Sequence, residues 1–207
     1  MAEYHLKAPL TDADVEKLKI GDIVYISGKC FTCRSRLQKY IFDEHHTLPF
    51  TTDDRNVLIH NGPIVVKEDG KWRLVSFMPT SSIRFEKWGA KSVENWNLKM
   101  IVGKTTMGKE TADMMKKKKC VHVSPRSVSP NLWIDSIEVE DVHLFDELGS
   151  IEASWFFKVT ELGPFIVDID TEGNNLFDKM DVEIAARKAE ALKSLGIDPD
   201  YKFTKLY

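Results

Sequence analysis

Three junctions in the sequence combine a cationic side chain with hydroxyl groups. They are Thr32-Cys33-Arg34, Pro79-Thr80-Ser81-Ser82-Ile83-Arg84 and Gly103-Lys104-Thr105-Thr106. Each lies between a predicted strand and a predicted helix, where the free N–H groups and the dipole of the helix favour an anion. Arginine adds a planar fork that fits a carboxylate, and lysine adds a point charge. Two arginines, a lysine and a threonine that faced one pocket would therefore suit a small dicarboxylate.

The second junction carries the most specific spacing. Thr80 and Arg84 are four residues apart, so on a helix that began at Thr80 they would lie one above the other on the same face. Taken alone, each junction also has a simpler interpretation, because a Ser or Thr after a proline often does no more than cap a helix. The sequence pattern does not by itself bring the three junctions together.

The three cysteines suggest a different chemistry. Cys30 and Cys33 form a C-x-x-C motif and Cys120 is the third, which is the number of thiolates that a cluster with one open iron needs. A lone C-x-x-C is also a redox pair in some proteins and a chance occurrence in others. The simplest interpretation is that Cys120 packs as a small apolar residue, and we predict no metal site within this chain.

Composition limits the classes of protein that remain. The chain has 207 residues and a formal net charge of −3, so no overall field favours nucleic acid or an anionic membrane. No apolar run reaches the length of a transmembrane helix, and Met1–Leu10 lacks the apolar core of a signal peptide. We therefore expect a cytoplasmic protein with a sizeable core.

Apolar patterning and turn residues predict the elements that must position these side chains. Helices are predicted over Thr11–Leu18, Cys33–Glu44, Thr105–Lys119 and Val182–Leu195, and a further helix is predicted to begin after Pro79. Two strands are predicted within Asn56–Val66, on either side of Asn61-Gly62-Pro63. The other predicted strands are Gly21–Gly28, Trp72–Phe77, Leu98–Lys104, Val121–Val123, Ile137–Leu144, Ser154–Val159 and Pro164–Asp170. This order predicts a mixed α/β layout without the strict alternation of a doubly wound sheet.

The order of these blocks resembles the β subunit, or C-terminal domain, of the iron–sulfur class I fumarases and L-tartrate dehydratases. The resemblance extends from about Leu10 to Phe177. It is carried by GDIVYISG, Thr32-x-Arg34, Asn61-Gly62-Pro63, PTSSIR, Gly103-Lys104 and the stretch EASWFFKV…PFIVDIDTEGNNLF. For the fold, the resemblance implies a single layered swivelling β/β/α domain over residues 1–178, followed by a C-terminal helix and tail over residues 179–207.

For function, the resemblance implies one subunit of a hydro-lyase that hydrates fumarate reversibly to malate. The family uses a [4Fe–4S] cluster whose open iron acts as a Lewis acid, and the cluster cysteines belong to an α subunit. We therefore expect this chain to act only with an α subunit, in an α2β2 assembly. The alternatives are a tartrate or methylfumarate dehydratase subunit, or a non-catalytic anion-binding or regulatory subunit on the same fold.

The resemblance also assigns roles to four residues at the junctions. Arg34, Arg84 and Lys104 would bind substrate carboxylates or the charge that develops during reaction, and Thr80 would lie beside the substrate as the candidate proton-transfer residue. Thr80 and Lys104 are thus the implied catalytic residues. A threonine hydroxyl is a poor base in water, so this role requires nearby cations and an acidic group from the α subunit.

Three stretches depart from the family pattern. Ser35, Arg36 and Leu37 follow Arg34 where many members have other residues, and Met78 replaces a common glycine before Pro79. A glycine- and alanine-rich stretch is replaced by SPRSVSPNLW, Ser124–Trp133. The four implied site residues are retained, so the departures bear mainly on which dicarboxylate is the substrate.

Overall fold

A computed structural model describes residues 1–127, 129–198 and 200–204 of the chain. The chain forms two compact units, Met1–Asn175 and Leu176–Tyr207. The departing stretch Ser124–Trp133 includes residue 128, which lies outside the described residues. The assignment of residues 1–178 to a catalytic domain and of residues 179–207 to a tail stays a prediction.

Among the described residues, the first unit contains nine strands and five α-helices, and the second contains one long helix. The strands are β1 (Glu3–Lys7), β2 (Ile23–Cys33), β3 (Val57–His60), β4 (Ile64–Glu68), β5 (Lys71–Ser76), β6 (Met100–Val102), β7 (Val121–Pro125), β8 (Ile137–His143) and β9 (Ser154–Ile169). The helices are α1 (Asp12–Glu16), α2 (Ser35–Phe42), α3 (Glu86–Asn95), α4 (Lys109–Lys118), α5 (Phe145–Leu148) and α6 (Leu176–Ser194), with short 3₁₀ turns at Ser82–Phe85 and Ile134–Ser136. Among the described residues, no helix is long and apolar enough to cross a membrane.

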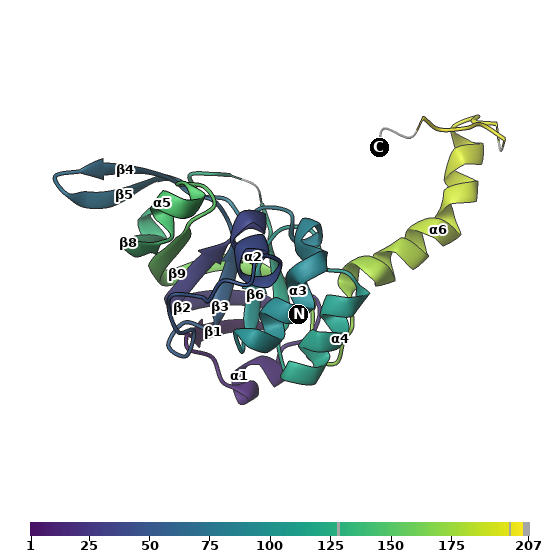
Figure 1. Ribbon diagram of the computed structural model, residues 1–207. Coiled ribbons are helices and arrows are strands. Elements are labelled where there is room, and N and C mark those ends of the chain that lie inside the picture. The colour runs from purple at the N-terminus through teal and green to yellow at the C-terminus, as the bar shows by residue number, and fades with distance from the viewer. Residues whose placement is uncertain (128, 199, 205–207) are drawn as a thin grey trace. The chain divides into compact units, whose positions relative to one another are not determined.

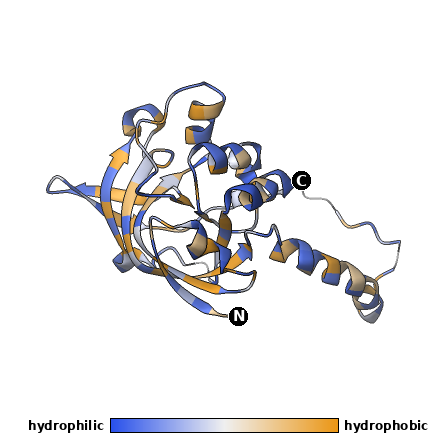
Figure 2. Ribbon diagram, turned by 90° about the horizontal axis from the view of Figure 1, so that it is seen from below, coloured by the Kyte–Doolittle hydropathy of each residue, from blue (hydrophilic) through white to orange (hydrophobic). Residues whose placement is uncertain are grey.

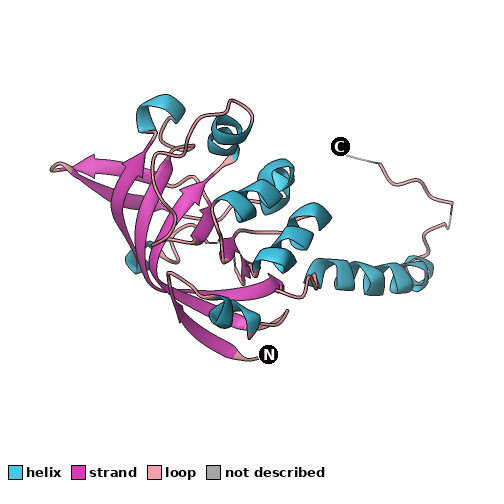
Figure 3. Cartoon of the chain, turned by 60° about the horizontal axis from the view of Figure 1, so that its bottom comes forward, coloured by secondary structure: helices cyan, strands magenta, loops and turns pink. Residues whose placement is uncertain are grey.

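Seven strands form one sheet in the order β1-β2-β3-β6-β7-β9-β8, and β2 also pairs with β9. The strands β2, β3, β6, β7 and β9 therefore close into a ring (Figures 1 and 3). Neighbours from β1 to β7 are parallel, whereas β9 runs antiparallel to both β2 and β7. The hairpin of β4 and β5 forms a separate sheet that extends from one side of the ring (Figure 1). The mixed α/β fold class is thereby confirmed.

Alternating side chains along the ring belong to two buried clusters. In β3, Val57 and Ile59 lie in a cluster inside the ring, whereas Leu58 lies in a cluster with residues of α2, α3 and α4. The same alternation leaves β6 apolar on both faces, as expected for a parallel strand that is covered on both sides, whereas β7 has Val121 and Val123 on one face and the polar His122 and Ser124 on the other. Figure 2 shows the resulting mixture of hydrophobic and hydrophilic residues along the longer strands. One face of β3 and β6 thus packs against residues of three helices.

Three predicted element boundaries are wrong, and each correction concerns a candidate site. The helix predicted over Thr105–Lys119 begins only at Lys109, because Thr105 has a left-handed φ of 64° and Gly108 is the extended N-cap. The helix predicted from Thr80 begins as the 3₁₀ turn Ser82–Phe85. The helix predicted over Cys33–Glu44 begins at Ser35, since Cys33 still belongs to β2.

The remaining differences lie farther from the junctions. The predicted strands Ser154–Val159 and Pro164–Asp170 are parts of the continuous strand β9, which accommodates Pro164 within it. The helix predicted over Val182–Leu195 begins earlier, at Leu176. The two strands predicted around Asn61-Gly62-Pro63 are present, but β3 belongs to the ring and β4 pairs with β5. The turn at Asn61 therefore carries the chain out of the ring.

Candidate active site

The candidate site lies where three parallel strands end. Cys33 is in register with His60, and Ile59 is in register with Val102. Arg34 therefore follows the end of β2, Asn61 follows the end of β3, and Lys104 lies two residues beyond β6 at the same edge. Because the carboxyl ends of parallel strands meet at one edge of a sheet, two of the three junctions are brought together by strand order alone.

The segment that contains Thr80 is attached to this edge by backbone hydrogen bonds. The N–H of Thr80 donates to the carbonyl of His60 over 2.7 Å, and the N–H of Lys104 donates to the carbonyl of Thr80 over 3.0 Å. The N–H of Ser82 in turn donates to the carbonyl of Lys104 over 2.8 Å. Ser81 and Lys104 thereby form a parallel β-bridge. The second and third junctions are side by side.

The predicted contact between Thr80 and Arg84 is present, but the predicted reason for it is wrong. An Nη2–H of Arg84 donates to Oγ1 of Thr80. Thr80 precedes the 3₁₀ turn Ser82–Phe85, so the two residues are not stacked on a regular helix. Arg84 is exposed and Thr80 is half-buried, so the pair presents a guanidinium and a hydroxyl at the surface of the chain.

Arg34 lies at the same edge but has another partner. It occupies the N-cap position of α2, and its Nε lies 3.1 Å from Oε1 of Glu152 in an ion pair that lacks hydrogen-bond geometry. A Cβ on Gly62 would lie 2.8 Å from Cδ of Arg34, so the turn after β3 packs directly on this side chain. Within the described part of the chain, no polar contact joins Arg34 to Thr80, Arg84 or Lys104. Hydrogen bonds thus connect three of the four predicted residues, Thr80, Arg84 and Lys104. The fourth, Arg34, lies near the ends of β2 and β3 without a polar contact to these three described residues.

Several buried polar atoms at this edge lack a hydrogen-bond partner. Among the described residues they include Nε of Arg34, Nε2 of His60 and Nδ2 of Asn61. Buried polar groups are rarely left unpaired, so each such atom calls for an explanation. Two of the three atoms are donors on a guanidinium and an amide, which suit an anionic ligand or an acidic group from another chain.

The sequence analysis missed a buried polar network beneath the site. Oγ of Ser82 lies 2.8 Å from Nδ1 of His60 and 2.8 Å from Nε2 of His122, and Nδ1 of His122 lies 2.6 Å from Oδ1 of Asp168. Oγ of Ser124 contacts Oδ2 of Asp168. The available signal was His122 itself, a polar residue between two valines in the predicted strand Val121–Val123.

Burial has a clear effect on His60. The imidazole is fully enclosed, and burial, followed by the proximity of His122, holds the pKa of His60 well below its ordinary value of 6.5. His60 is therefore neutral at pH 7. A neutral imidazole has one N–H, so His60 can donate from Nδ1 to Ser82 and leaves a bare acceptor at Nε2.

This depressed pKa predicts an acid-dependent loss of stability. In the unfolded chain His60 takes up a proton as the pH falls below about 6.5, whereas the folded protein does not, so the free energy of unfolding decreases there. The slope from this one group is at most about 1.4 kcal/mol per pH unit. His60→Asn keeps a side-chain donor near the position of Nδ1 and removes the titration, so its unfolding free energy should fall less between pH 6.5 and 5.

Urea unfolding of both proteins at pH 5.0, 5.75 and 6.5 measures this difference. His5, whose pKa is raised by its hydrogen bond to Glu161, has the opposite pH dependence, but it is present in both proteins and cancels in the comparison. Equal slopes for the wild type and His60→Asn would contradict the assignment of a proton-free His60.

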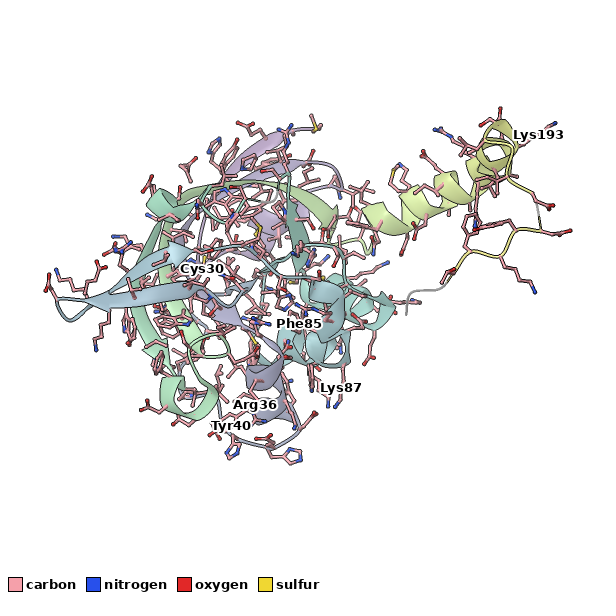
Figure 4. All side chains as sticks on the ribbon, turned by 90° about the horizontal axis from the view of Figure 1, so that it is seen from above. Cys30, Arg36, Tyr40, Phe85, Lys87 and Lys193 are labelled. Atoms are coloured by element: carbon pink, nitrogen blue, oxygen red, sulfur yellow. The ribbon has the colours of Figure 1, made fainter. Side chains whose placement is uncertain are left out.

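The cysteines do not form a three-thiolate site. Cys30 lies in the cluster inside the ring (Figure 4), whereas Cys33 and Cys120 lie in the cluster under the helices. All three are fully buried, and burial raises the pKa of Cys30 to about 12 and raises that of Cys33 and Cys120 as well. Thiolates are the metal ligands and nucleophiles, so these thiols are structural. No group of three or more His, Cys, Asp or Glu among the described residues could hold a metal ion.

Known proteins resemble this chain over most of its length. The sequence model of the family described as "Fumarase C-terminus" matches residues 1–180. The L(+)-tartrate dehydratase subunit beta of Escherichia coli strain K12 is 36% identical over 172 residues, which are 83% of this chain and 85% of that protein. A Geobacillus stearothermophilus protein with the provisional name fumarate hydratase class I is 32% identical over 178 residues, which are 85% of this chain and 34% of that protein.

Proposed function

Because this chain belongs to the fumarase C-terminus family, we propose that it is the β-type subunit of an iron–sulfur-dependent hydro-lyase that interconverts fumarate and malate. It supplies carboxylate-binding and proton-transfer side chains to a site that a second subunit completes. L(+)-tartrate is the second candidate substrate, because the relative that is 36% identical carries that name. The two substrates share two carboxylates, which is the chemistry that the cations of this chain suit.

The observation that carries the proposal is the junction of Thr80, Arg84 and Lys104 at the strand edge. Removal of a proton beside a carboxylate builds negative charge on that carboxylate, and a fixed guanidinium or ammonium lowers the cost of this charge. Arg84 and Lys104 serve this purpose, while Arg34 anchors the second carboxylate. The hydroxyl of Thr80 already accepts a hydrogen bond from Arg84, which favours a more acidic hydroxyl and hence proton transfer by Thr80.

The cluster belongs to the partner in this proposal. The three thiols of this chain lie in two separate buried clusters, so they do not fit a [4Fe–4S] centre. The relatives are named as a subunit beta, which supports an α subunit as the source of the cluster ligands. We place two copies of each subunit in a symmetric α2β2 assembly. The buried polar atoms of Arg34, His60 and Asn61 that lack a hydrogen-bond partner mark the edge that would face substrate or the α subunit.

Co-expression with the α subunit tests the proposal. The purified complex, reconstituted anaerobically, should hydrate fumarate or dehydrate malate, and each subunit alone should be inactive. Fumarate, tartrate and methylfumarate are compared by kcat/KM, since specificity depends on a few pocket contacts. A complex in which the α subunit is fully active without this chain would instead indicate a regulatory role, and an intact complex that turns over none of the three substrates would refute the hydro-lyase assignment.

A further inference from the structure

Three of the four residues that touch substrate in the proposed function, Thr80, Arg84 and Lys104, belong to two backbone segments that are hydrogen-bonded to each other next to one buried serine. Ser82 follows Thr80 by two residues and precedes Arg84 by two, and it has no exposed surface. Its hydroxyl lies between the imidazoles of His60 and His122, 2.8 Å from each. A Cβ on Gly103 would lie 1.7 Å from this hydroxyl, so only glycine at position 103 leaves room for it.

The direction of the hydrogen bonds follows from the chemistry of the groups. Asp168 accepts from Nδ1–H of His122 over 2.6 Å, which leaves Nε2 of His122 as an acceptor. The single proton of the Ser82 hydroxyl then goes to His122, so Nδ1 of the neutral His60 must donate to Ser82. Each polar atom from Nδ1 of His60 through Ser82 and His122 to Oδ1 of Asp168 thus has a defined partner, whereas Nε2 of His60 has none. A buried chain of hydrogen bonds of this kind favours one arrangement of the backbone that carries it.

The same network reaches the backbone next to Lys104. The hydroxyl of Ser124 lies within hydrogen-bond distance of two acceptors, Oδ2 of Asp168 and the carbonyl of Thr105, which is 2.8 Å away, so its one proton is shared between them. Thr105 has a φ of 64°, a conformation that is unfavourable for a β-branched residue and persists only where the surroundings hold it. The bond to Ser124 is one such restraint, and it acts on the residue that directly follows Lys104.

The hydrogen-bonded side chains of Ser82, His122, Asp168 and Ser124 are named the anchor network here. We propose that the anchor network holds the residues of the proposed hydro-lyase site in position. One end holds the segment that carries Thr80 and Arg84, and the other end holds the segment that carries Lys104. Since all four of its residues are buried, we give the network a positioning role and no part in the chemistry itself. It keeps the hydroxyl, the guanidinium and the ammonium at constant separation, and a displacement of about 1 Å at such groups costs on the order of 100-fold in rate.

Ser82→Ala and Ser92→Ala form a matched pair to test this inference, which rests on the proposed function. Ser92 is also fully buried, and its hydroxyl accepts one hydrogen bond, from Gln38 on the neighbouring helix. Both substitutions remove the same atom at the same burial. We expect Ser82→Ala to lower kcat/KM of the complete enzyme by roughly 10- to 100-fold and Ser92→Ala to lower it by less than about threefold. The loss should shrink when Thr80→Val is already present, because groups that act as one unit are not additive.

Hydrogen exchange on the full chain gives a readout that does not depend on activity. In Ser82→Ala, the amides of Thr80, Ser82 and Lys104 should exchange at least about tenfold faster, whereas Ser92→Ala should leave them unchanged. Ser124→Ala severs the other end of the anchor network and should accelerate exchange near Lys104 but not at Thr80, and Ser124→Thr should restore protection. If Ser82→Ala does not fold, the exchange rates of Ser124→Ala still test the proposal.

Unchanged exchange at these amides, or equal kinetic losses in the two serine variants, would overturn the anchor network as a positioning device. An enzyme that turns over no dicarboxylate would refute the proposed function but leave the exchange measurement decisive for the network. The two failures are therefore distinguishable.

Discussion

Replacing Arg84 by alanine in the complete two-subunit enzyme is expected to lower kcat/KM by about 30- to about 5,000-fold. A buried charge contact of this kind is worth ~2–5 kcal/mol when it is lost, and each 1.36 kcal/mol corresponds to a factor of ten in rate. The guanidinium is exposed in this chain, so the upper part of the range applies if the partner subunit closes the site. The unfolding temperature should change little, because the packing of Arg84 within this chain is slight.

Two further substitutions make this result specific. Arg84→Lys should recover only part of the activity, because lysine keeps the charge and loses the planar fork. Arg36→Ala should retain near-normal activity, because Arg36 pairs with Glu44 over 2.7 Å on the exposed side of α2 (Figure 4). Steady-state kinetics and thermal melting of the three variants complete the test. Near-normal activity of Arg84→Ala, or a loss that is explained by unfolding, would contradict the carboxylate-binding role.

Replacing Thr80 by valine should lower kcat by on the order of 10²- to 10⁴-fold, the range that a positioned proton-transfer group contributes. Valine has nearly the same shape, and the backbone of Thr80 is held independently by its bonds to His60 and Lys104. The variant therefore removes the hydroxyl and leaves its scaffold in place. The binding of dicarboxylate should weaken much less than kcat, because the cations remain.

Thr80→Ser is the matched control, since it restores the hydroxyl without the methyl group and should stay within about tenfold of the wild type. Kinetics of hydration and of solvent-proton exchange into malate should be measured for both variants. If Thr80→Val exchanges protons at the wild-type rate, another group transfers the proton and Thr80 is only a contact.

The local chemistry of the candidate site could be predicted from sequence because it depends on residue type and near spacing. A hydroxyl and a guanidinium four residues apart at a helix start are within reach of each other in several backbone conformations. The contact between Thr80 and Arg84 was therefore predicted correctly even though the helix begins two residues later than expected. The position of Lys104 after an apolar strand was equally visible in the sequence.

The anchor network could not be predicted in the same way. Ser82, His122 and Asp168 are 40 and 46 residues apart along the chain, and no periodicity relates them. They meet because β7 pairs with β9 and because Gly103 leaves space above β6. Sequence periodicity reports which face of an element is apolar, but it carries no information on which polar side chain of another element will lie opposite.

The sequence by itself thus determined the mixed α/β class and the family, and it singled out the candidate residues of the proposed site, because each of these depends on composition, order and short-range spacing. The tertiary structure alone decided which junctions lie next to one another and which buried side chains hold them in place. It joined the segment of Thr80 to Lys104 through the β-bridge of Ser81, placed Arg34 beside Glu152 and separated the three cysteines into two cores. The physical reason is that strand pairing and burial are long-range, so a buried hydroxyl such as that of Ser82 acquires its partners only when the ring closes.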